Sequence, residues 1–411
     1  MVRNGGGSGD HQPKLLVAKG SFYTMGGAER DLIRNLPALS EEFEVVVATL
    51  SSSPDLESVC EEYGLRLMRP EEVWSPPSDT ISKILDSGFS SATKSWKSIV
   101  GLVDSIGDFD CIHITSGDGS LGILGIIPDD VAIHFHLLEP HRGLHEDVLH
   151  RMIDGTPKRN LGITRAALSR ARIRDLSIIR ALSSRESTMI SGNSEFTSSR
   201  IGEVYGIPSG VLLPSLDSSE FPFEPSDRES AVFEGVESPY VVTIGRASWA
   251  KGTWEVISML QGSGHSLALV GGADDDSISS LAEHAKSCKV GLWIAPRLAS
   301  HDLCTLVRGA TAVVSMAHSE PFGLTPIEAQ SLGTPALFVN EGGFRETVSD
   351  GVSGRLLPRD NHSSWHDAIN QSLEPENRVK WSENGRENIS LMGLNPRRFS
   401  ERLASIFREL V

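Results

Sequence analysis

Cysteine is scarce in this sequence of 411 residues, which contains four. Cys60, Cys111, Cys288 and Cys304 lie far apart in the chain and match no spacing of metal ligands. We therefore expect reduced thiols and no zinc site, a pattern that is typical of a cytoplasmic protein.

Positive charge is also in short supply. The chain has 38 Lys and Arg residues against 54 Asp and Glu residues, which gives a net charge of -16. Most of such a surface would repel a polyanion, and this argues against general nucleic-acid binding. A local basic patch is still compatible with the composition.

Residues 151–185 form such a basic stretch. They hold two anions, Asp154 and Asp175, against nine cations, which are Arg151, Lys158, Arg159, Arg165, Arg170, Arg172, Arg174, Arg180 and Arg185. One interpretation is a solvated helix face. The other is a surface for anionic lipid headgroups or a phosphate-bearing acceptor, which would place the protein peripherally at the inner face of the membrane.

Long apolar runs are missing as well. The run Leu121–Ile127 is broken at Pro128, far short of the about 20 residues that a membrane-spanning helix needs. Residues 1–13 lack the apolar segment of a secretory signal and are expected to form a flexible tail.

What the sequence does contain is a regular alternation of short aliphatic runs and amphipathic stretches. Leu15–Ala18 and Val45–Ala48 are predicted strands, and Ala28–Leu39 between them is a predicted helix. This βαβ rhythm predicts an α/β fold with parallel sheets. Residues 70–95, which are rich in proline and serine, are predicted to form a loop that shapes an acceptor pocket.

The length and the hydrophobic content of 39% suit two cored domains. We place the first domain at residues 14–215 and the second at residues 216–390, because Phe221–Pro225 has the composition of a linker. The final segment, 391–411, is predicted to be helical.

Paired glycines, Gly26 and Gly27, separate the first predicted strand from the first helix. Without side chains, they would let backbone amides at the helix start approach a ligand closely. The spacing is not the dinucleotide-binding fingerprint. The alternative is a plain tight turn.

The stretch Ser319–Glu346 carries the most information. A buried strand, Ala312–Met316, precedes it, and Pro326 suits the first turn of a helix. The predicted strand-to-helix loop consists of Phe322, Gly323, Leu324 and Thr325. The free amides of such a helix start would face an anion.

Two acids flank this loop, Glu320 before it and Glu328 inside the helix. A second strand-to-helix turn, after Tyr240–Ile244, carries Arg246 and Lys251. The Arg fork can bridge two phosphate oxygens, whereas the Lys acts as a point charge. Cations and amides for a diphosphate, with carboxylates for hydroxyl groups, are the chemistry that a nucleotide sugar requires.

These residues resemble the signature of the retaining family 4 (group 1) glycosyltransferases of GT-B fold. The resemblance rests on Glu320 and Glu328 with seven residues between them, on the core Ser319–Leu324 and on Glu341–Gly354. It is strongest from Gly245 onward. It implies two Rossmann-like domains facing across a central cleft, with the C-terminal helix crossing back to the first domain.

The resemblance also implies roles for individual residues. Arg246 and Lys251 would neutralise the leaving nucleotide, Glu320 would bind the transferred hexose and Glu328 the ribose. The other donor-binding candidates are Gly26, Gly27, Arg297, Phe322, Gly323, Leu324 and Thr325. The alternative for the two cations is ordinary exposed surface charge, and for the two acids solvated helix ends.

A predicted strand, Val131–His136, carries two histidines near its end. His134 and His136 share one face, because side chains alternate along a strand. The segment His136–Arg142 resembles the family's stretch with a cleft histidine, and His136 is the catalytic candidate because it lies nearer the strand end. A structural histidine is the alternative, and the sequence does not separate the two residues.

Together these observations predict transfer of a hexose from a nucleotide-diphosphate sugar to a hydroxyl acceptor. UDP is the favoured donor nucleotide, GDP is the alternative, and glycan, glycolipid or cell-surface polysaccharide synthesis is the expected context. Retention follows from the resemblance alone. No metal or cofactor is expected, because cations and amides take its place. The rival functions are a sugar-nucleotide epimerase, a glycogen-phosphorylase-like enzyme and a non-catalytic binding subunit of GT-B fold.

Overall fold

The computed structural model describes residues 12–23, 25–76, 87–224, 233–295 and 297–411. Most of the predicted tail, residues 77–86 of the predicted loop and the end of the predicted linker lie outside these ranges. The strands are β1 (Lys14–Ser21), β2 (Glu44–Ser51), β3 (Arg66–Met68), β4 (Cys111–Thr115), β5 (Ala132–His136), β6 (Thr188–Gly192), β7 (Gly210–Val211), β8 (Tyr240–Ile244), β9 (Ser266–Val270), β10 (Leu292–Ala295), β11 (Val313–Ser315), β12 (Ala336–Val339) and β13 (Arg355–Leu357).

Helices connect almost all of these strands. The α-helices are α1 (Gly27–Glu42), α2 (Pro54–Glu62), α4 (Ser87–Ser98), α5 (Leu102–Ser105), α6 (Arg142–His145), α7 (Leu161–Ala167), α8 (Ser169–Ser183), α9 (Glu195–Tyr205), α10 (Thr253–Leu260), α11 (Asp275–Cys288), α12 (Ser300–Gly309), α13 (Leu324–Ser331), α14 (Phe344–Thr347), α15 (His362–Leu373), α16 (Pro375–Met392) and α17 (Pro396–Leu410). Single 3-10 turns are η1 (Ile106–Asp108), η2 (Ser120–Gly125), η3 (Val148–His150) and η4 (Trp249–Lys251).

Two parallel sheets organise these elements, and they share one strand order, except that the first sheet has β7 as an additional strand beside β6. Strands β1 to β6 follow the order β3-β2-β1-β4-β5-β6, and the second sheet follows the order β10-β9-β8-β11-β12-β13. In such doubly wound sheets, ligands bind beyond the carboxyl ends of the strands, at the point where the strand order reverses. In the second sheet this point lies between β8 and β11.

The described residues group into two compact units by their contacts. The first contains residues up to Leu137, Ile178–Ser191 and Pro396–Val411, and the second contains Leu138–Ser177 and Gly192–Asn395. The predicted domain boundaries at residues 215 and 390 stay predictions.

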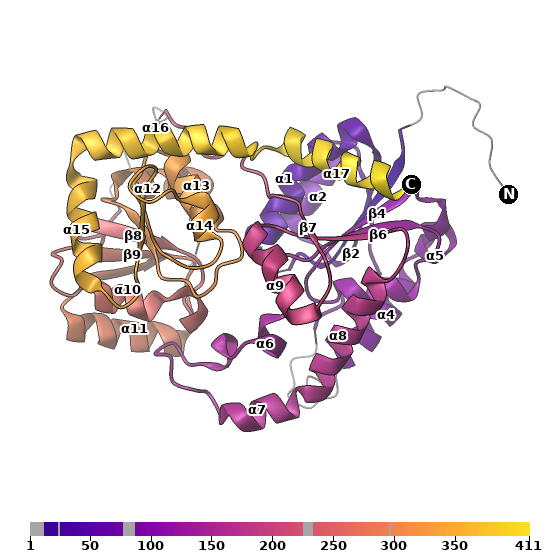
Figure 1. Cartoon of the computed structure of the whole chain (residues 1–411), viewed down its shortest axis with the longest axis horizontal. Coiled ribbons are helices and arrows are strands. Elements are labelled where there is room, and N and C mark those ends of the chain that lie inside the picture. The colour runs from indigo at the N-terminus through magenta and orange to yellow at the C-terminus, as the bar shows by residue number, and fades with distance from the viewer. Residues whose placement is uncertain (1–11, 24, 77–86, 225–232, 296) are drawn as a thin grey trace. The chain divides into compact units, whose positions relative to one another are not determined.

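The last helix, α17, packs beside α1 in the first unit (Figure 1). Phe399, Leu403 and Phe407 repeat at intervals of four residues and are buried, as expected for the inward face of an amphipathic helix. The ring of Phe407 meets Phe43 edge to face, with 6.2 Å between the ring centroids. The end of the chain therefore completes the unit that its beginning starts.

Most predicted strands and helices are confirmed; Leu15–Ala18 lies within β1 and Ala28–Leu39 lies within α1. The predicted loop 70–95 was wrong at its end, because α4 already begins at Ser87. Ala92 and Trp96 are buried and four residues apart, so they form the apolar face of α4, whose many serines obscure the helical pattern.

Candidate functional site

The turn that follows β8 holds Lys251 in a defined position. The amide of Ala247 donates to the carbonyl of Gly272 at 2.9 Å, which fixes the turn against the one that follows β9. The hydroxyl of Ser248 then caps η4 by accepting from the amide of Lys251 at 3.3 Å. Lys251 therefore stands at the start of α10, beyond the carboxyl end of β8.

The loop after β11 holds Glu320 by close backbone packing. A Cβ on Gly342 would lie 2.5 Å from the carbonyl oxygen of Glu320, and one on Gly343 would lie 2.4 Å from that of Pro321. The amide of Gly343 donates to the carbonyl of Glu320 at 2.8 Å. Only glycine allows so close an approach, so Gly342 and Gly343 serve to position Glu320.

Lys251 and Glu320 meet as an ion pair. The Nζ atom of Lys251 lies 2.8 Å from Oε2 and 3.1 Å from Oε1 of Glu320. Their side chains are 40% and 19% exposed, so a ligand can reach both groups. The pair spans the switch point between β8 and β11, and this is where the fold predicts a polar ligand.

Helix α13 begins two residues earlier than predicted. Gly323, with φ of +90°, is its N-cap, so Leu324 and Thr325 belong to the first turn and not to the preceding loop. The amides of a first helical turn have no partner within the helix and attract an anion. Glu328 lies further along α13 and is only 3% exposed, whereas Phe322 is buried and can offer only its backbone.

A charged network supports the loop that carries Glu320. His318 Nε2 lies 2.8 Å from Oε2 of Glu255, and Arg359 donates to Glu255 at 3.0 Å and to Glu341 at 2.7 Å. Burial alone would raise the pKa of Glu341, but the Arg359 guanidinium outweighs it and the pKa lies below its usual value. These charges are mutually paired, so they stiffen the loop rather than compete for a ligand.

Two residues that the sequence did not single out adjoin this loop, Glu139 and Arg142. Arg142 is buried and donates from Nη2 to the carbonyl of His318 at 2.7 Å. Glu139 lies 3.9 Å from Nε of Arg142. Burial raises the pKa of Glu139 to about 7, a net value to which the negative charges of Glu320 and Glu146 contribute and which Arg142 and Lys251 oppose. The available signal was a carboxylate and a cation three residues apart beyond a strand end.

The start of α9 also contacts this region. The Ser194 hydroxyl donates to the carbonyl of Pro321, and the carboxylate of Glu346 accepts from the amides of Glu195 and Phe196 at 3.0 and 2.7 Å. Glu346 thus neutralises the positive end of the α9 dipole. The start of α9 and the Glu320 loop are joined through these contacts.

In the first unit, the paired glycines stand where the sequence placed them, at the start of α1. The Gly26 amide is already engaged, because it donates to the Glu29 carboxylate at 2.9 Å. Glu29 in turn pairs with the buried Lys19 at 3.1 Å. The helix start is therefore held by protein groups, a capping box that the Ala-Glu after the glycines could have predicted.

The two candidate histidines of β5 lie in a buried cluster with His113 of β4. His113 and His134 share a hydrogen bond of 2.9 Å between their Nδ1 atoms. His136 is 2% exposed, and its ring centroid lies 6.3 Å from that of Phe399 on α17. Burial lowers the pKa of His113 and of His134 well below the ordinary value, and the neighbouring histidines lower both further. These rings are therefore neutral at pH 7.

The remaining predicted cations are spread over the surface. Arg246 and Arg297 are exposed. In the basic stretch 151–185, Arg165 pairs with Asp147, and Arg172 donates to the carbonyl of Leu144. Among the described residues, no group of three or more His, Cys, Asp or Glu side chains is arranged to hold a metal ion, and no helix has the length and apolarity needed to cross a bilayer.

Comparison with known proteins bears first on the segment of the chain that holds the Lys251–Glu320 pair. Residues 227–388 match the family model described as Glycosyl transferases group 1. This group 1 segment contains the η4 turn, the Glu320 loop and α13. The comparisons therefore support the group 1 glycosyltransferase family that the sequence motifs indicated.

Curated relatives share stretches of this chain. The D-inositol 3-phosphate glycosyltransferase of Saccharomonospora viridis is 36% identical over 115 residues, which are 28% of this chain and 26% of that protein. The enzyme of the same name from Xylanimonas cellulosilytica is 30% identical over 181 residues, which are 41% of this chain and 43% of that protein. The chain thus spans less than half the length of these relatives.

Solved structures resemble the whole chain. HepE of Anabaena, in complex with UDP and glucose, has a TM-score of 0.68 and 16% identity, and the match covers 96% of this chain and 100% of that one. Sucrose-phosphate synthase from Thermosynechococcus elongatus has a TM-score of 0.70 and 17% identity, with 97% and 99% covered. The predicted fold class is confirmed: an α/β fold with two parallel sheets that matches GT-B glycosyltransferases.

Within the group 1 segment, the structure brings together Lys251, Glu320 and the start of α13, all predicted from the sequence. Gly26, Gly27 and His136 belong to the other unit. Sequence reasoning missed Glu255 and Arg359, whose partners are distant in the chain. It also missed Glu139 and Arg142, a local pair of which Arg142 reaches the distant carbonyl of His318.

Proposed function

We propose that this protein is a glycosyltransferase that moves a hexose from a nucleotide-diphosphate sugar to a hydroxyl acceptor. The observation that carries the proposal is the Lys251–Glu320 pair at the switch point of the second sheet, within the group 1 segment. A cation that neutralises phosphate and a carboxylate that accepts from sugar hydroxyls are the two groups that this donor needs.

Catalysis in this proposal is mainly electrostatic. Breaking the anomeric bond leaves negative charge on the β-phosphate and positive charge on the sugar. Arg246, Lys251 and the amides at the start of α13 stabilise the first, because they are oriented before the reaction begins. On donor binding Lys251 exchanges its contact with Glu320 for the diphosphate, which frees the carboxylate for the hexose, while Glu328 binds the ribose.

The finer assignments belong to the same proposal. We take transfer to proceed with retention and without a metal ion, as expected for the retaining group 1 enzymes that the motifs resemble. UDP is the preferred donor nucleotide, supported by the fold shared with HepE, which has been solved with UDP and with UDP-glucose. Arg297 and the backbone that follows β10 are assigned to the nucleobase.

The acceptor assignment is broader: a hydroxyl compound of glycan, glycolipid or cell-surface polysaccharide synthesis. The relatives named above act, by their names, on D-inositol 3-phosphate or form sucrose phosphate, which favours a phosphorylated acceptor. The proposal includes peripheral contact of residues 151–185 with an anionic membrane. Basic residues in this stretch would attract the lipid headgroups, and the exposed side chains of Ile163 and Ile173 would contact the apolar part of the bilayer. Gly26 and Gly27 are assigned to donor binding, and His136 is assigned to catalysis.

The experiment that tests the proposal has two steps. The melting temperature is measured with nucleoside diphosphates and their sugars, since a ligand that binds only the folded state raises it in proportion to RT ln(1 + [L]/Kd). Nucleotide diphosphate released on incubation with the stabilising sugar and candidate acceptors is then quantified, with and without chelator. Release that is unaffected by chelator supports the enzyme, and strict dependence on Mg²⁺ contradicts the metal-free site.

The rival functions give different results in this experiment. A non-catalytic binding subunit would be stabilised by the nucleotide sugar and release no diphosphate with any acceptor. An epimerase would convert one nucleotide sugar to another without releasing the nucleotide. A chain that no nucleotide or nucleotide sugar stabilises would refute the proposal itself.

A further inference from the structure

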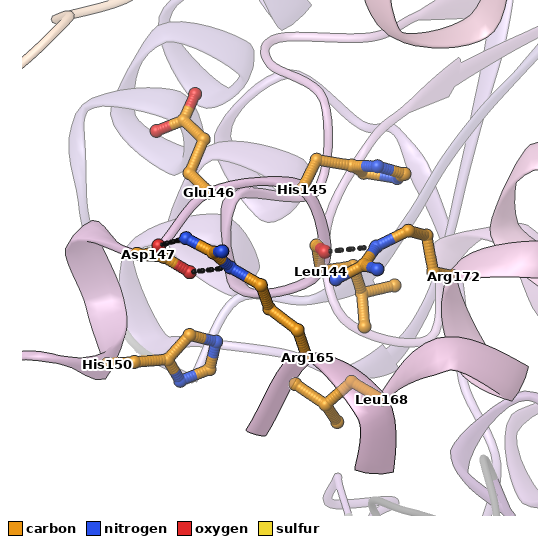
Figure 2. A pocket seen from close by; sticks show the side chains of 8 residues that line it. All are labelled: Leu144, His145, Glu146, Asp147, His150, Arg165, Leu168 and Arg172. Atoms are coloured by element: carbon orange, nitrogen blue, oxygen red, sulfur yellow. Dashed lines mark hydrogen bonds and ion pairs between the residues drawn. The ribbon is translucent and has the colours of Figure 1, made fainter. Parts of the chain in front are cut away.

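A cavity of about 380 Å³ lies in the second unit, between the α6–η3 segment and the helices α7 and α8. Its walls are formed by eight residues, Leu144, His145, Glu146, Asp147, His150, Arg165, Leu168 and Arg172 (Figure 2). None of them belongs to the proposed donor site. The volume is at the lower end of the range for small-molecule sites, about 300–1,000 Å³.

The carboxylates that line this cavity are committed to other cations. Asp147 accepts two hydrogen bonds from Arg165, one from Nε at 3.0 Å, and this contact holds the pKa of Asp147 below its ordinary value. Glu146 pairs with Arg142 at 3.0 Å and with Arg200 at 3.1 Å. Its carboxylate points away from Arg165 and Arg172 in Figure 2. Both negative charges are therefore balanced without Arg172.

Arg172 is the cation of the cavity wall that pairs with neither Asp147 nor Glu146. Its Nε atom donates to the carbonyl of Leu144 at 2.7 Å, and among the described residues no carboxylate lies within ion-pair distance of it. A guanidinium has five N–H donors, so four remain beyond this bond. Arg172 is half-buried, and a partly desolvated charge without a counter-charge is unfavourable. An anion in the cavity would remove that cost.

Two further groups set the chemistry of the ligand. Nε2 of His150 donates to the carbonyl of Gly143 at 2.8 Å, and with the proton on Nε2 the Nδ1 atom of the same ring can accept from a ligand hydroxyl. Asp147 is fixed by Arg165 and still has lone pairs that can accept from a hydroxyl group. The cavity thus offers the N–H groups of Arg172 to an anion, beside acceptors on His150 and Asp147 for hydroxyl groups.

We propose that this cavity binds the phosphomonoester of a small polyol or sugar, with Arg172 as the residue that pairs with the phosphate. The Arg fork matches two phosphate oxygens at once, and the ligand hydroxyls are accepted by Asp147. A soluble sugar phosphate and a phosphomonoester lipid headgroup present the same chemistry. The proposal concerns binding and does not depend on the glycosyl transfer proposed above.

The test measures binding of the full chain without any nucleotide sugar. Titration calorimetry with glycerol 3-phosphate, a hexose 6-phosphate and inorganic phosphate is compared with glycerol and the unphosphorylated hexose. We expect saturable binding of the two phosphate esters and none of the uncharged compounds. Arg172→Gln should weaken binding about tenfold or more, because one charge-assisted pair is lost.

Matched variants keep the result interpretable. Lys286→Gln removes an exposed cation of α11 in the same unit, outside the basic stretch, and should bind like the unaltered protein. Leu168→Trp fills the cavity and leaves every charge in place, so it should abolish binding without changing the response to nucleotide sugars. If Arg172→Gln does not fold, Arg172→Lys and Leu168→Trp carry the test.

A second arm separates the two sources of the ligand. Phosphatidylcholine vesicles with and without phosphatidic acid are sedimented with each variant. Binding to phosphatidic acid alone, lost in Arg172→Gln and in Leu168→Trp, assigns the cavity to a lipid headgroup, and binding of the soluble esters assigns it to a free metabolite. If neither the soluble esters nor the vesicles bind, or if Lys286→Gln weakens binding as much as Arg172→Gln does, the proposal is overturned. Failure of nucleotide release alone would affect only the proposed function.

Discussion

Strands β5 and β11 both lie near the centre of their sheets, and polar residues lie at or beyond the carboxyl end of each strand. The surroundings of these polar residues differ: they are buried at β5 and in reach of solvent at β11. At β5 the polar groups are His134 and His136, whose rings are buried against the aromatic residues of α17. At β11 they are charged, and Glu320 pairs with Lys251 in reach of solvent. The strand order alone does not decide which edge handles a polar ligand.

What covers each edge makes the difference. Phe399 and Phe407 of α17 lie over His113 and His134, and burial lowers the pKa of both histidines well below the ordinary value. The Glu320 loop is instead braced by paired charges, with Arg359 between Glu255 and Glu341. A preformed charged site requires such bracing, because oriented charges stabilise a transition state only when they do not have to reorganise.

The largest effect should come from removing the cations at β8. Lys251→Ala or Arg246→Ala should slow transfer by on the order of 2–4 kcal/mol in the barrier, because a charge-assisted contact to a phosphate that gains charge is lost. The initial rate of nucleotide release at saturating donor measures this. Lys286→Ala, an exposed cation on α11 of the same unit, is the control. Near-normal turnover in both variants would remove the phosphate assignment.

Acid should next distinguish the two edges. The pKa values of His113 and His134 are lowered by burial, so the unfolded chain binds protons that the folded chain does not. Stability is therefore complete above the unfolded pKa near 6.5 and falls as the pH drops below it. Urea unfolding at pH 7.5 and pH 5 should show this fall, and His134→Phe should reduce it.

His362→Gln provides the matched control, since His362 is exposed at the start of α15. It should leave the pH dependence unchanged. Stability that is flat between pH 7.5 and pH 5 in the unaltered protein would mean that the buried histidines accept protons readily.

A smaller effect is expected from crowding the Glu320 backbone. Gly342 and Gly351 both have positive φ, 58° and 71°, but only a Cβ on Gly342 would meet another atom, the Glu320 oxygen at 2.5 Å. Each Ala variant should lose about 1–2 kcal/mol to the left-handed backbone. Gly342→Ala should lose about 2 kcal/mol more and also reduce turnover. Equal losses in urea unfolding would show that the packing of the loop is soft.

The smallest effect concerns Glu139, whose pKa is raised to about 7 by burial. Between its ordinary value of 4.5 and about 7 the folded protein holds a proton that the unfolded chain has released, so stability falls as the pH rises through this window. The side chain in Glu139→Gln cannot ionise. At pH 8 the free energy of unfolding of this variant should therefore exceed that of the unaltered protein by about 1 kcal/mol, a figure reduced for solvent screening. Melting curves at pH 5 and pH 8 measure it.

The control for this variant is Glu283→Gln, which removes an exposed carboxyl of α11. Its melting curves should differ from those of the unaltered protein by the same amount at both pH values. If Glu139→Gln also differs from the unaltered protein by the same amount at pH 5 and pH 8, the pKa of Glu139 is not raised by burial.

The sequence was informative where the relevant pattern is local. The strand, loop and helix around Glu320 occupy about twenty consecutive residues, so aliphatic runs, glycine and proline could define them. The contact between Arg142 and the His318 carbonyl joins residues 176 positions apart and leaves no local pattern. The burial of His136 likewise depends on Phe399, far along the chain, and periodicity on β5 could not reveal it.

The placement of α17 in the first unit has a consequence for how the chain is made. Strands β1 to β5 leave the ribosome early, but the helix that covers His113 and His134 is translated after the whole second unit. Until then, the face of the nascent sheet that carries these rings stays uncovered. The unit that is begun first is finished last, and a stop codon before Pro396 would leave the aromatic and imidazole groups of its interior open to water.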